Sequence, residues 1–273
     1  MKSKGILSLI LNLILAVLAI ITIIPFIWML VSSFAPNSEI VKLGGGLFPG
    51  MSTFNNYTNI QEKFNFMGMF WNSLMISVTI TAIIIYTSAL FGFIFAKFTF
   101  KGKSLLFAVV MSTMMLPWAV TIIPKYEMMV KFGWLDSYKS LIIPSMVSGF
   151  GIFMFKQSIS GISNELIEAA RVDGGSDFYI FHRLILPMSR NTISSLAIFQ
   201  FLWSWEDFLW PYLMINTKSK QLLAVGLRQF NGQYGTDYGG LFAATTISII
   251  PIVIVYIIFQ KRFIAGIATG SSK

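Results

Sequence analysis

The chain alternates between long uncharged apolar runs and shorter segments that hold most of its charged residues. About 20 apolar residues in a helix are enough to cross the hydrocarbon core of a bilayer. The runs that approach this length predict six membrane-spanning helices, at approximately residues 6–30, 70–96, 104–124, 140–155, 191–215 and 241–260. No linker rich in Pro, Gly or Ser divides the pattern. The sequence therefore predicts an all-α polytopic membrane protein in which residues 1–273 form a single transmembrane domain.

Three features of these runs affect the prediction. The first run is far longer than the 7 to 15 apolar residues of a signal peptide, so it is expected to stay as a span. The fourth has only sixteen residues between Lys139 and Lys156, which favours a tilted or shielded helix. Neighbouring helices in a bundle satisfy the carbonyls that proline leaves free, so prolines within or at the ends of the runs are expected to form kinks; they are Pro25, Pro117, Pro124, Pro144, Pro211 and Pro251.

Composition agrees with this pattern and excludes several classes of protein. Hydrophobic residues make up 55% of the chain and charged residues 11%, whereas soluble domains have about 25% charged residues. The absence of cysteine excludes a disulfide framework, a thiolate nucleophile and a cysteine zinc site, and a single histidine cannot form an imidazole metal site. We therefore expect no catalytic and no metal site. His182 is expected to pack or to bond locally.

The distribution of basic residues predicts the orientation. With the N-terminus inside, the cytoplasmic segments hold 12 Lys and Arg residues and the outer loops hold 8. This bias places both termini in the cytoplasm. It also explains the formal net charge of +9 without a nucleic acid partner.

One cytoplasmic segment, residues 160–187, is far more polar than the rest. Ser163 is expected to cap a short helix, and the pair Gly174-Gly175 to end it, because glycine adopts a left-handed turn without strain. Ser176 is expected to cap a second helix that Pro187 stops. An apolar side on the first helix is predicted from Leu166, Ile167, Ala170 and Val172. A helix this short is marginal alone, so it packs on a partner or, as the alternative, lies on lipid.

The same segment resembles a known signature. Glu168-Ala169-Ala170, Gly174, Leu184 and Leu186-Pro187 are spaced as in the EAA motif of the permease subunits of bacterial ABC importers, with leucine at 184 where the family commonly has isoleucine. Six spans with this loop before the fifth, and the stretch FLWSWEDFLWP at 201–211, resemble the carbohydrate branch and its maltose-type second permease. The resemblance covers nearly the whole chain and implies the type I ABC importer permease fold.

The resemblance also implies a mechanism and a set of partners. The EAA loop would act as a coupling helix seated in a cleft of an ATP-hydrolysing subunit. Its partners would be a second homologous permease, two ATP-binding subunits that use ATP and Mg²⁺, and an extracytoplasmic sugar-binding protein, in a bacterial cytoplasmic membrane. The residues implied in coupling are Glu168, Ala169, Ala170, Arg171, Asp173, Gly174, Leu186 and Pro187.

The chain itself is not expected to hydrolyse ATP. Gly102-Lys103-Ser104 has the end of a phosphate-binding loop, but that motif requires glycine at position 97, where this chain has lysine. The sequence therefore predicts a transport component and no enzyme.

Polar and aromatic side chains gather on one side of the predicted fifth span. At about 100° per residue, Trp203, Glu206 and Trp210 share one stripe and Gln200, Ser204 and Asp207 share the next. A carboxylate at bilayer depth is a functional hypothesis, because burying it is costly. Aromatic faces and hydrogen-bonding groups suit sugars, so these six residues are the predicted substrate pathway. Alternatively, the carboxylates pair with a cation of a partner subunit and Trp210 belongs to an interfacial belt; Glu206 stands where the family often has asparagine.

Three functions stay open at this stage. The first is the permease of an ABC importer for a sugar or oligosaccharide. The second is an ABC permease for another solute, such as an amino acid, a peptide or phosphate. The third is a secondary transporter that uses Glu206 or Asp207 as a proton relay, and the coupling loop argues against it because a proton-driven carrier needs none.

Overall fold

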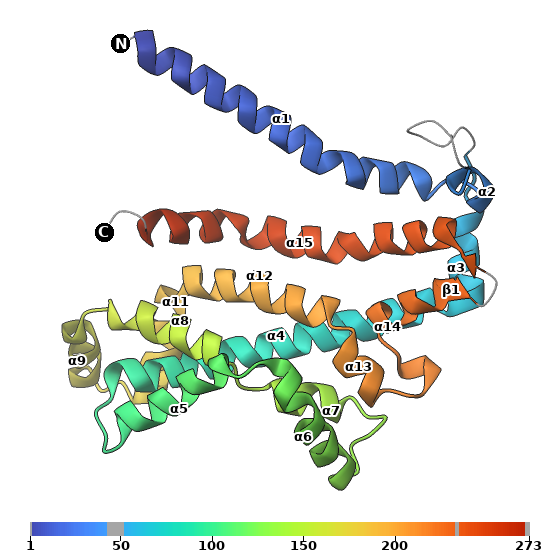
Figure 1. Cartoon of the computed structure of the whole chain (residues 1–273). Helices are drawn as coiled ribbons and strands as arrows, with labels where there is room; N and C mark the ends of the chain where they lie inside the picture. The colour runs from blue at the N-terminus through green and yellow to red at the C-terminus, as the bar shows by residue number, and fades with distance from the viewer. Residues whose placement is uncertain (1, 43–51, 233–234, 271–273) are drawn as a thin grey trace. The chain divides into compact units, whose positions relative to one another are not determined.

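A computed structural model describes residues 2–42, 52–232 and 235–270 (Figure 1). The regular secondary structure of the described chain is helical apart from one antiparallel pair of two-residue strands, β1 (Asn231–Gly232) and β2 (Gly235–Thr236). Two compact units are present, residues 1–67 with 226–250 and residues 68–225 with 251–273. The prediction that residues 1–273 form a single transmembrane domain stays a prediction.

The first unit contains α1 (Lys2–Ser32), α2 (Asn37–Ile40), α3 (Asn55–Phe64), the 3₁₀ turn η4 (Arg228–Phe230), the strand pair and the start of α15 (Tyr238–Gly270). Its α1–α2 connection is held by the buried amide of Asn56, which donates to the carbonyls of Ser33 and Ala35 at 2.8 and 2.9 Å. These bonds satisfy two backbone carbonyls that follow the end of α1.

The second unit is organised around the long helix α4 (Phe66–Lys97). Its other elements, in chain order, are α5 (Lys103–Met115), α6 (Trp118–Lys131), α7 (Lys139–Ile142), η1 (Ile143–Ser145), α8 (Gly149–Ser160), α9 (Asn164–Val172), α10 (Asp177–Ile180), η2 (Phe181–Ile185), α11 (Leu186–Met188), α12 (Arg190–Glu206), α13 (Leu209–Met214), η3 (Lys218–Lys220), most of α14 (Leu223–Leu227) and the end of α15.

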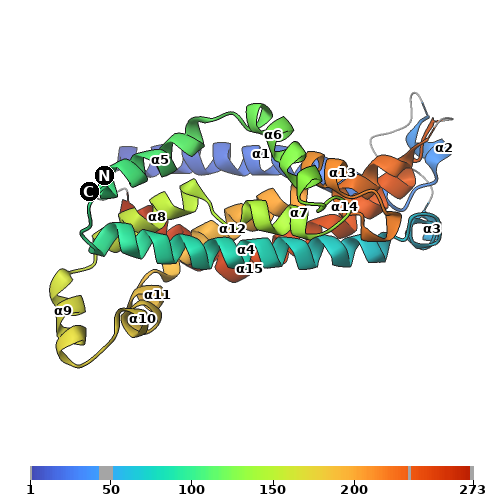
Figure 2. The same ribbon diagram turned by 90° about the horizontal axis from the view of Figure 1, so that it is seen from below.

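Helix α8 packs closely on its neighbours in this unit (Figures 1 and 2). A Cβ atom added to Gly92 of α4 would meet the Phe155 side chain of α8, and one added to Gly151 of α8 would meet Ser88 of α4 and Leu196 of α12. Phe155 and Leu196 are fully buried. Glycine at these two positions therefore allows helix backbones to approach within the distance that a side chain would fill.

Four described helical segments are long and apolar enough to cross a membrane: Ser8–Ser32, Phe66–Lys97, Lys139–Ser160 and Tyr238–Ile264. A fifth candidate is the bent pair Lys103–Met115 with Trp118–Lys131. The chain is thus an all-α protein with several possible spans, as predicted. The count of six spans stays a prediction, because the fifth predicted span contains α12, which has only 17 residues and is not among these candidates.

The predicted span 104–124 differs from a single kinked helix. It is broken at Leu116-Pro117, and the two halves meet at 103°. Leu116 has extended backbone angles (φ −78°, ψ 119°), which is the region that the residue before proline prefers. By contrast, Pro25, Pro124 and Pro251 lie inside helices, and the predicted kinks at these positions stay predictions.

The predicted span 191–215 is also interrupted. Helix α12 ends at Glu206, Asp207 is extended (φ −63°, ψ 116°), and α13 begins at Leu209. The predicted stripe of Trp203, Glu206 and Trp210 on one continuous helix was therefore wrong at Trp210. Trp210 and Pro211 belong to a separate short helix, although both lie beside Asp207 in one cavity.

Candidate functional site

The loop that resembles the EAA motif ends its first helix with a Schellman motif. The N–H of Gly175 donates to the carbonyl of Ala170 at 2.9 Å, and that of Gly174 donates to Arg171 at 3.0 Å. Gly174 has φ +85°, which confirms the predicted left-handed turn. Both predicted caps are confirmed as well, since Ser163 accepts the N–H of Glu165 and Ser176 accepts that of Tyr179.

An ion pair spans the turn between α9 and α10. The Nη2 and Nε atoms of Arg171 lie 2.7 and 3.1 Å from one carboxylate oxygen of Asp177, and the Arg171 guanidinium lies over the ring of Phe98. Both partners are about half exposed, so the pair adds at most about 1 kcal/mol. Arg171 is thus engaged within its own loop.

The two sides of α9 have different surroundings. Ile167 is buried in the core of the second unit and Ala170 packs against that core. Val172, by contrast, is 88% exposed and Leu166 is 40% exposed. The predicted packing of the apolar side of α9 on a partner therefore stays a prediction. Glu168, Ala169 and Asp173 are exposed, and among the described residues Glu168 makes no ion pair.

Pro187 does not stop the second helix. A π-helical turn, η2, follows α10 and leads through α11 into α12, and the N–H of Leu186 donates to Phe181, five residues earlier. A π turn widens the helix, so the proline ring is accommodated where a regular α-turn would bring it against a carbonyl. The segment from Asp177 to Met188 is therefore helical up to the start of α12, and the predicted stop was wrong. Leu186 packs against the core of this unit.

His182 bonds locally, as predicted. Its Nδ1 lies 2.9 Å from the carbonyl of Phe178 and its Nε2 lies 3.3 Å from the hydroxyl of Tyr86. The side chain thus connects η2 to α4, and it has a structural role in this loop.

Helix α4 connects loop 160–187 to the other end of its unit. Lys97, its last residue, donates to the carbonyl of Ile162 and to Oδ1 of Asn164, next to α9. Near its start, Asn72 donates to the carbonyls of Ser219 and Gln221. At 1.5 Å per residue these two positions are about 38 Å apart, comparable with the thickness of a bilayer that includes its headgroups.

Two cavities meet at Asp207. One, of about 180 Å³, is lined by five of the six predicted pathway residues, Gln200, Trp203, Ser204, Asp207 and Trp210, together with residues of α4. The other, of about 300 Å³, is lined by Asp207, Trp210, Ser145 and residues of α6. Glu206 lines neither cavity and is exposed.

The groups around Asp207 are oriented by hydrogen bonds. The Nε2 of Gln200 donates to the hydroxyl of Ser204 at 3.1 Å. The backbone N–H of Trp210, in the first turn of α13, donates to the Asp207 carboxylate. The indole Nε1 of Trp210 donates to the carbonyl of Ser140 at 3.0 Å. Asp207 thus has a structural role even before any ligand is considered.

Lys125 was missed as a member of this site. The spacing of the apolar runs predicts an outer loop at Lys125, but this residue lies inside α6 and lines the larger cavity. Its Nζ lies 4.6 Å from the ring centroid of Trp210. A lysine within an apolar helix is a usable signal for a functional site. That signal appears only if the run is extended past Pro124.

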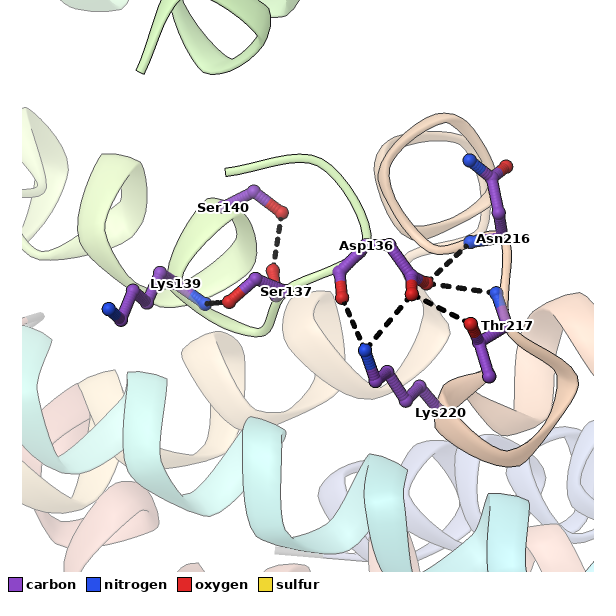
Figure 3. A network of polar contacts seen from close by, with 7 residues as sticks. All are labelled: Asp136, Ser137, Lys139, Ser140, Asn216, Thr217 and Lys220. Carbon is purple, nitrogen blue, oxygen red and sulfur yellow. Dashed lines mark hydrogen bonds and ion pairs between the residues drawn. The ribbon is translucent and has the colours of Figure 1, made fainter. Parts of the chain in front are cut away.

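A polar network holds the loop before α7 to the loop after α13 (Figure 3). Asp136 has φ +55° and its carboxylate accepts the N–H groups of Asn216 and Thr217, the Thr217 hydroxyl and the Lys220 ammonium at 2.7 to 3.0 Å. These donors, the Thr217 N–H first among them, hold the pKa of the Asp136 carboxyl well below its usual value. The N–H of Asp136 also donates to Met214, so the network fixes the end of α13.

Comparisons with known proteins identify the family. Residues 88–269 match the family described as "Binding-protein-dependent transport system inner membrane component". The chain is 33% identical to an arabinooligosaccharides transport system permease protein of Halalkalibacterium halodurans, over 100% of this chain and 99% of that protein. It is 28% identical to an sn-glycerol-3-phosphate transport system permease protein of Brucella abortus, over 97% and 98%.

A solved structure has the same fold. It is a bacterial ABC transporter involved in the import of the acidic polysaccharide alginate, and one chain superposes with a TM-score of 0.85 at 19% identity, over 96% of this chain and 98% of that one. With the family match, this makes the chain a multi-pass transport component rather than an enzyme, as the sequence predicted. The protein belongs to the family of binding-protein-dependent transport system inner membrane components.

Proposed function

We propose that the chain is one of two permeases that together form the translocation pathway of an ABC importer for a sugar or oligosaccharide. The observation that supports this most is the pair of cavities around Asp207. Trp203 and Trp210 supply aromatic faces for the C–H face of a sugar ring, and Asp207, Gln200 and Ser204 supply hydrogen-bonding groups for its hydroxyls. The larger cavity alone reaches the lower end of the range of ligand pockets, about 300 to 1,000 Å³.

In this proposal the loop 160–187 transmits ATP hydrolysis to the membrane helices. Two separate subunits bind ATP and Mg²⁺, and α9 docks on one of them through its exposed face. Glu168 is available there for a basic partner group, and the exposed Val172 side chain gives apolar area. The buried Ile167 and the bonds of Lys97 make α9 move with the second unit. Ile80 of the cavity wall is about 26 Å along α4 from Lys97.

The proposal also includes the location and the delivery of substrate. The chain lies in the bacterial cytoplasmic membrane with both termini inside, so the Asp136 network faces outward. An extracytoplasmic binding protein delivers the sugar at that side. Family membership supports a partner of this kind, since the family is named for its dependence on a binding protein.

A second candidate substrate is an anionic solute. The relative from Brucella abortus is named for sn-glycerol-3-phosphate, and Lys125 places a positive charge in the cavity wall. A proton-coupled carrier has weaker support, because the family is one of binding-protein-dependent systems. If it were correct, import would collapse when the pH gradient is discharged at constant ATP.

The substrate pathway is tested in proteoliposomes that contain the complete transporter. Asp207→Asn should leave assembly and ATPase activity largely intact, because the amide has the same shape and its oxygen can still accept the Trp210 N–H. It should lower sugar uptake or change sugar preference, because the negative charge and one acceptor oxygen are lost. Glu206→Gln is the matched control, since the neighbouring Glu206 lines neither cavity. Unchanged uptake and preference in Asp207→Asn, across a panel of neutral oligosaccharides, would remove Asp207 from the pathway.

The coupling role is tested with Glu168→Gln, measured as sugar uptake per ATP hydrolysed. We expect fewer sugars per ATP, because a charge that pairs with the ATP-binding subunit is lost. Glu127→Gln on α6 is the control, since it removes one exposed charge at a distance from the loop. Equal coupling in both variants would contradict the role of Glu168.

A further inference from the structure

The ammonium of Lys125 covers one face of a tryptophan in the substrate cavity. Its Nζ lies 4.6 Å from the centroid of the Trp210 ring, a cation–π distance. The ring itself is fixed, because its Nε1 donates to the carbonyl of Ser140. Lys125 comes from α6 and Trp210 from α13, and these helices pack on each other. The position of the positive charge is therefore defined by tertiary structure.

Lys125 and Asp207 supply the charge of the cavity walls. Among the described residues that line either cavity, they are the only charged ones. They line the larger cavity together, and their charges attract each other. The walls thus have no net charge, although each charge alone would act strongly on a ligand in a partly desolvated space.

We propose that Lys125 is a specificity-determining residue of the translocation pathway, which balances the charge of Asp207 and thereby sets the selectivity between neutral and anionic saccharides. The inference rests on the proposed function and extends it to a class of substrate. In neutral walls, an anionic sugar gains no net attraction that offsets the loss of its hydration, so neutral saccharides are favoured. Removal of either charge should shift this preference, and the two removals should act in opposite directions.

The experiment measures binding to the complete transporter in detergent, without its binding protein, so that only the membrane site selects. The two probes are arabinotriose, which is neutral, and trigalacturonate, which is anionic. Lys125→Met should lower the affinity for trigalacturonate relative to that for arabinotriose by about tenfold. This is the size expected for one charge several ångströms away at an effective dielectric constant between about 20 and 80. Asp207→Asn should raise this relative affinity by a similar factor, and the double variant should return to the ratio of the wild type.

Matched controls separate the local charge from the charge of the whole protein. Lys131→Met removes a lysine from the end of the same helix, and Glu206→Gln removes the carboxylate next to Asp207; both side chains are exposed outside the cavities. In these controls the ratio of the affinities for trigalacturonate and arabinotriose should stay within twofold of that of the wild type. The shifts of Lys125→Met and Asp207→Asn should shrink at high salt, because added ions screen the interaction.

Each outcome decides between the alternatives. The proposal is overturned if both single variants keep the affinity ratio within twofold of the wild type, or if both shift it in the same direction. In that case saccharide binding by the wild type still upholds the proposed function. A wild-type transporter that binds neither probe nor any neutral oligosaccharide overturns the proposed function and the inference with it. Lys125→Gln is measured if Lys125→Met does not assemble. If neither assembles, the lysine is structural and the proposal is wrong.

Discussion

Replacement of Gly174 by alanine should loosen the end of α9 through backbone strain alone. Gly174 has φ +85°, and a Cβ atom at this position would meet no other atom within 4 Å. The left-handed region costs a residue with a Cβ atom about 1–2 kcal/mol, and asparagine tolerates it better than alanine. That cost corresponds to an increase of about 5- to 30-fold in the population with the turn open. Valine, which is β-branched, should have a larger effect.

Hydrogen exchange of the purified protein measures this opening. The amides of Gly175 and of residue 174, which close the Schellman motif, should exchange about 5- to 30-fold faster in Gly174→Ala, and less fast in Gly174→Asn. Gly161→Ala, just before α9, is the control, because Gly161 has φ −77° and its added Cβ would make only an ordinary contact at 3.5 Å. Exchange in Gly174→Ala within twofold of the wild type would refute the strain argument.

Three further changes test other parts of the structure. Because the pKa of Asp136 is lowered on folding, chiefly by the Thr217 N–H, its carboxylate stabilises the two loops that it joins above about pH 4. This contribution is lost as the pH falls through the folded pKa. Asp136→Asn should therefore increase proteolysis of residues 214–220 at pH 7 and differ less from the wild type at lower pH; equal cleavage at pH 7 would contradict this. Asn56→Asp removes the amide donor to two buried-loop carbonyls, so it should lower the free energy of unfolding by about 1–3 kcal/mol, seen as a lower Tm, whereas Asn55→Asp on the exposed side should not. Gly151→Ala places a methyl group against α4 and α12, and it should cost about 1–3 kcal/mol of stability, again measured as Tm; an unchanged Tm would show that the helices can separate freely.

Signals that act within a few residues were predictable from the sequence. The serine caps, the left-handed Gly174 and the helical nature of the long apolar runs all follow from local backbone and hydropathy rules, and the structure has each of them. The break before Pro117 was within reach of the same rules, because the residue before a proline avoids the helical region. The prediction of a kink at Pro117 rested on the fact that neighbouring helices in a bundle can satisfy the carbonyls that a proline leaves free.

Features that depend on tertiary contacts were not predictable in this way. Helical geometry continues through Pro187 because a π turn accommodates it, and nothing in the local sequence announces that turn. Lys125 reaches the cavity only because the chain folds back after Pro117, which brings α6 against α13.

The gap between α12 and α13 divides the walls of the smaller cavity into two parts with different supports. Gln200, Trp203 and Ser204 stand on α12, which follows loop 160–187 through η2 and α11 with Ser189 as its only intervening residue. Trp210 stands on α13, which is bonded to Ser140 and to the loops of the Asp136 network. Turning α12 about its own axis would slide one wall past the other while these bonds stay in place. We therefore expect the extended Asp207 to act as a hinge, so that small displacements at loop 160–187 would change the shape of the cavity without unfolding a helix.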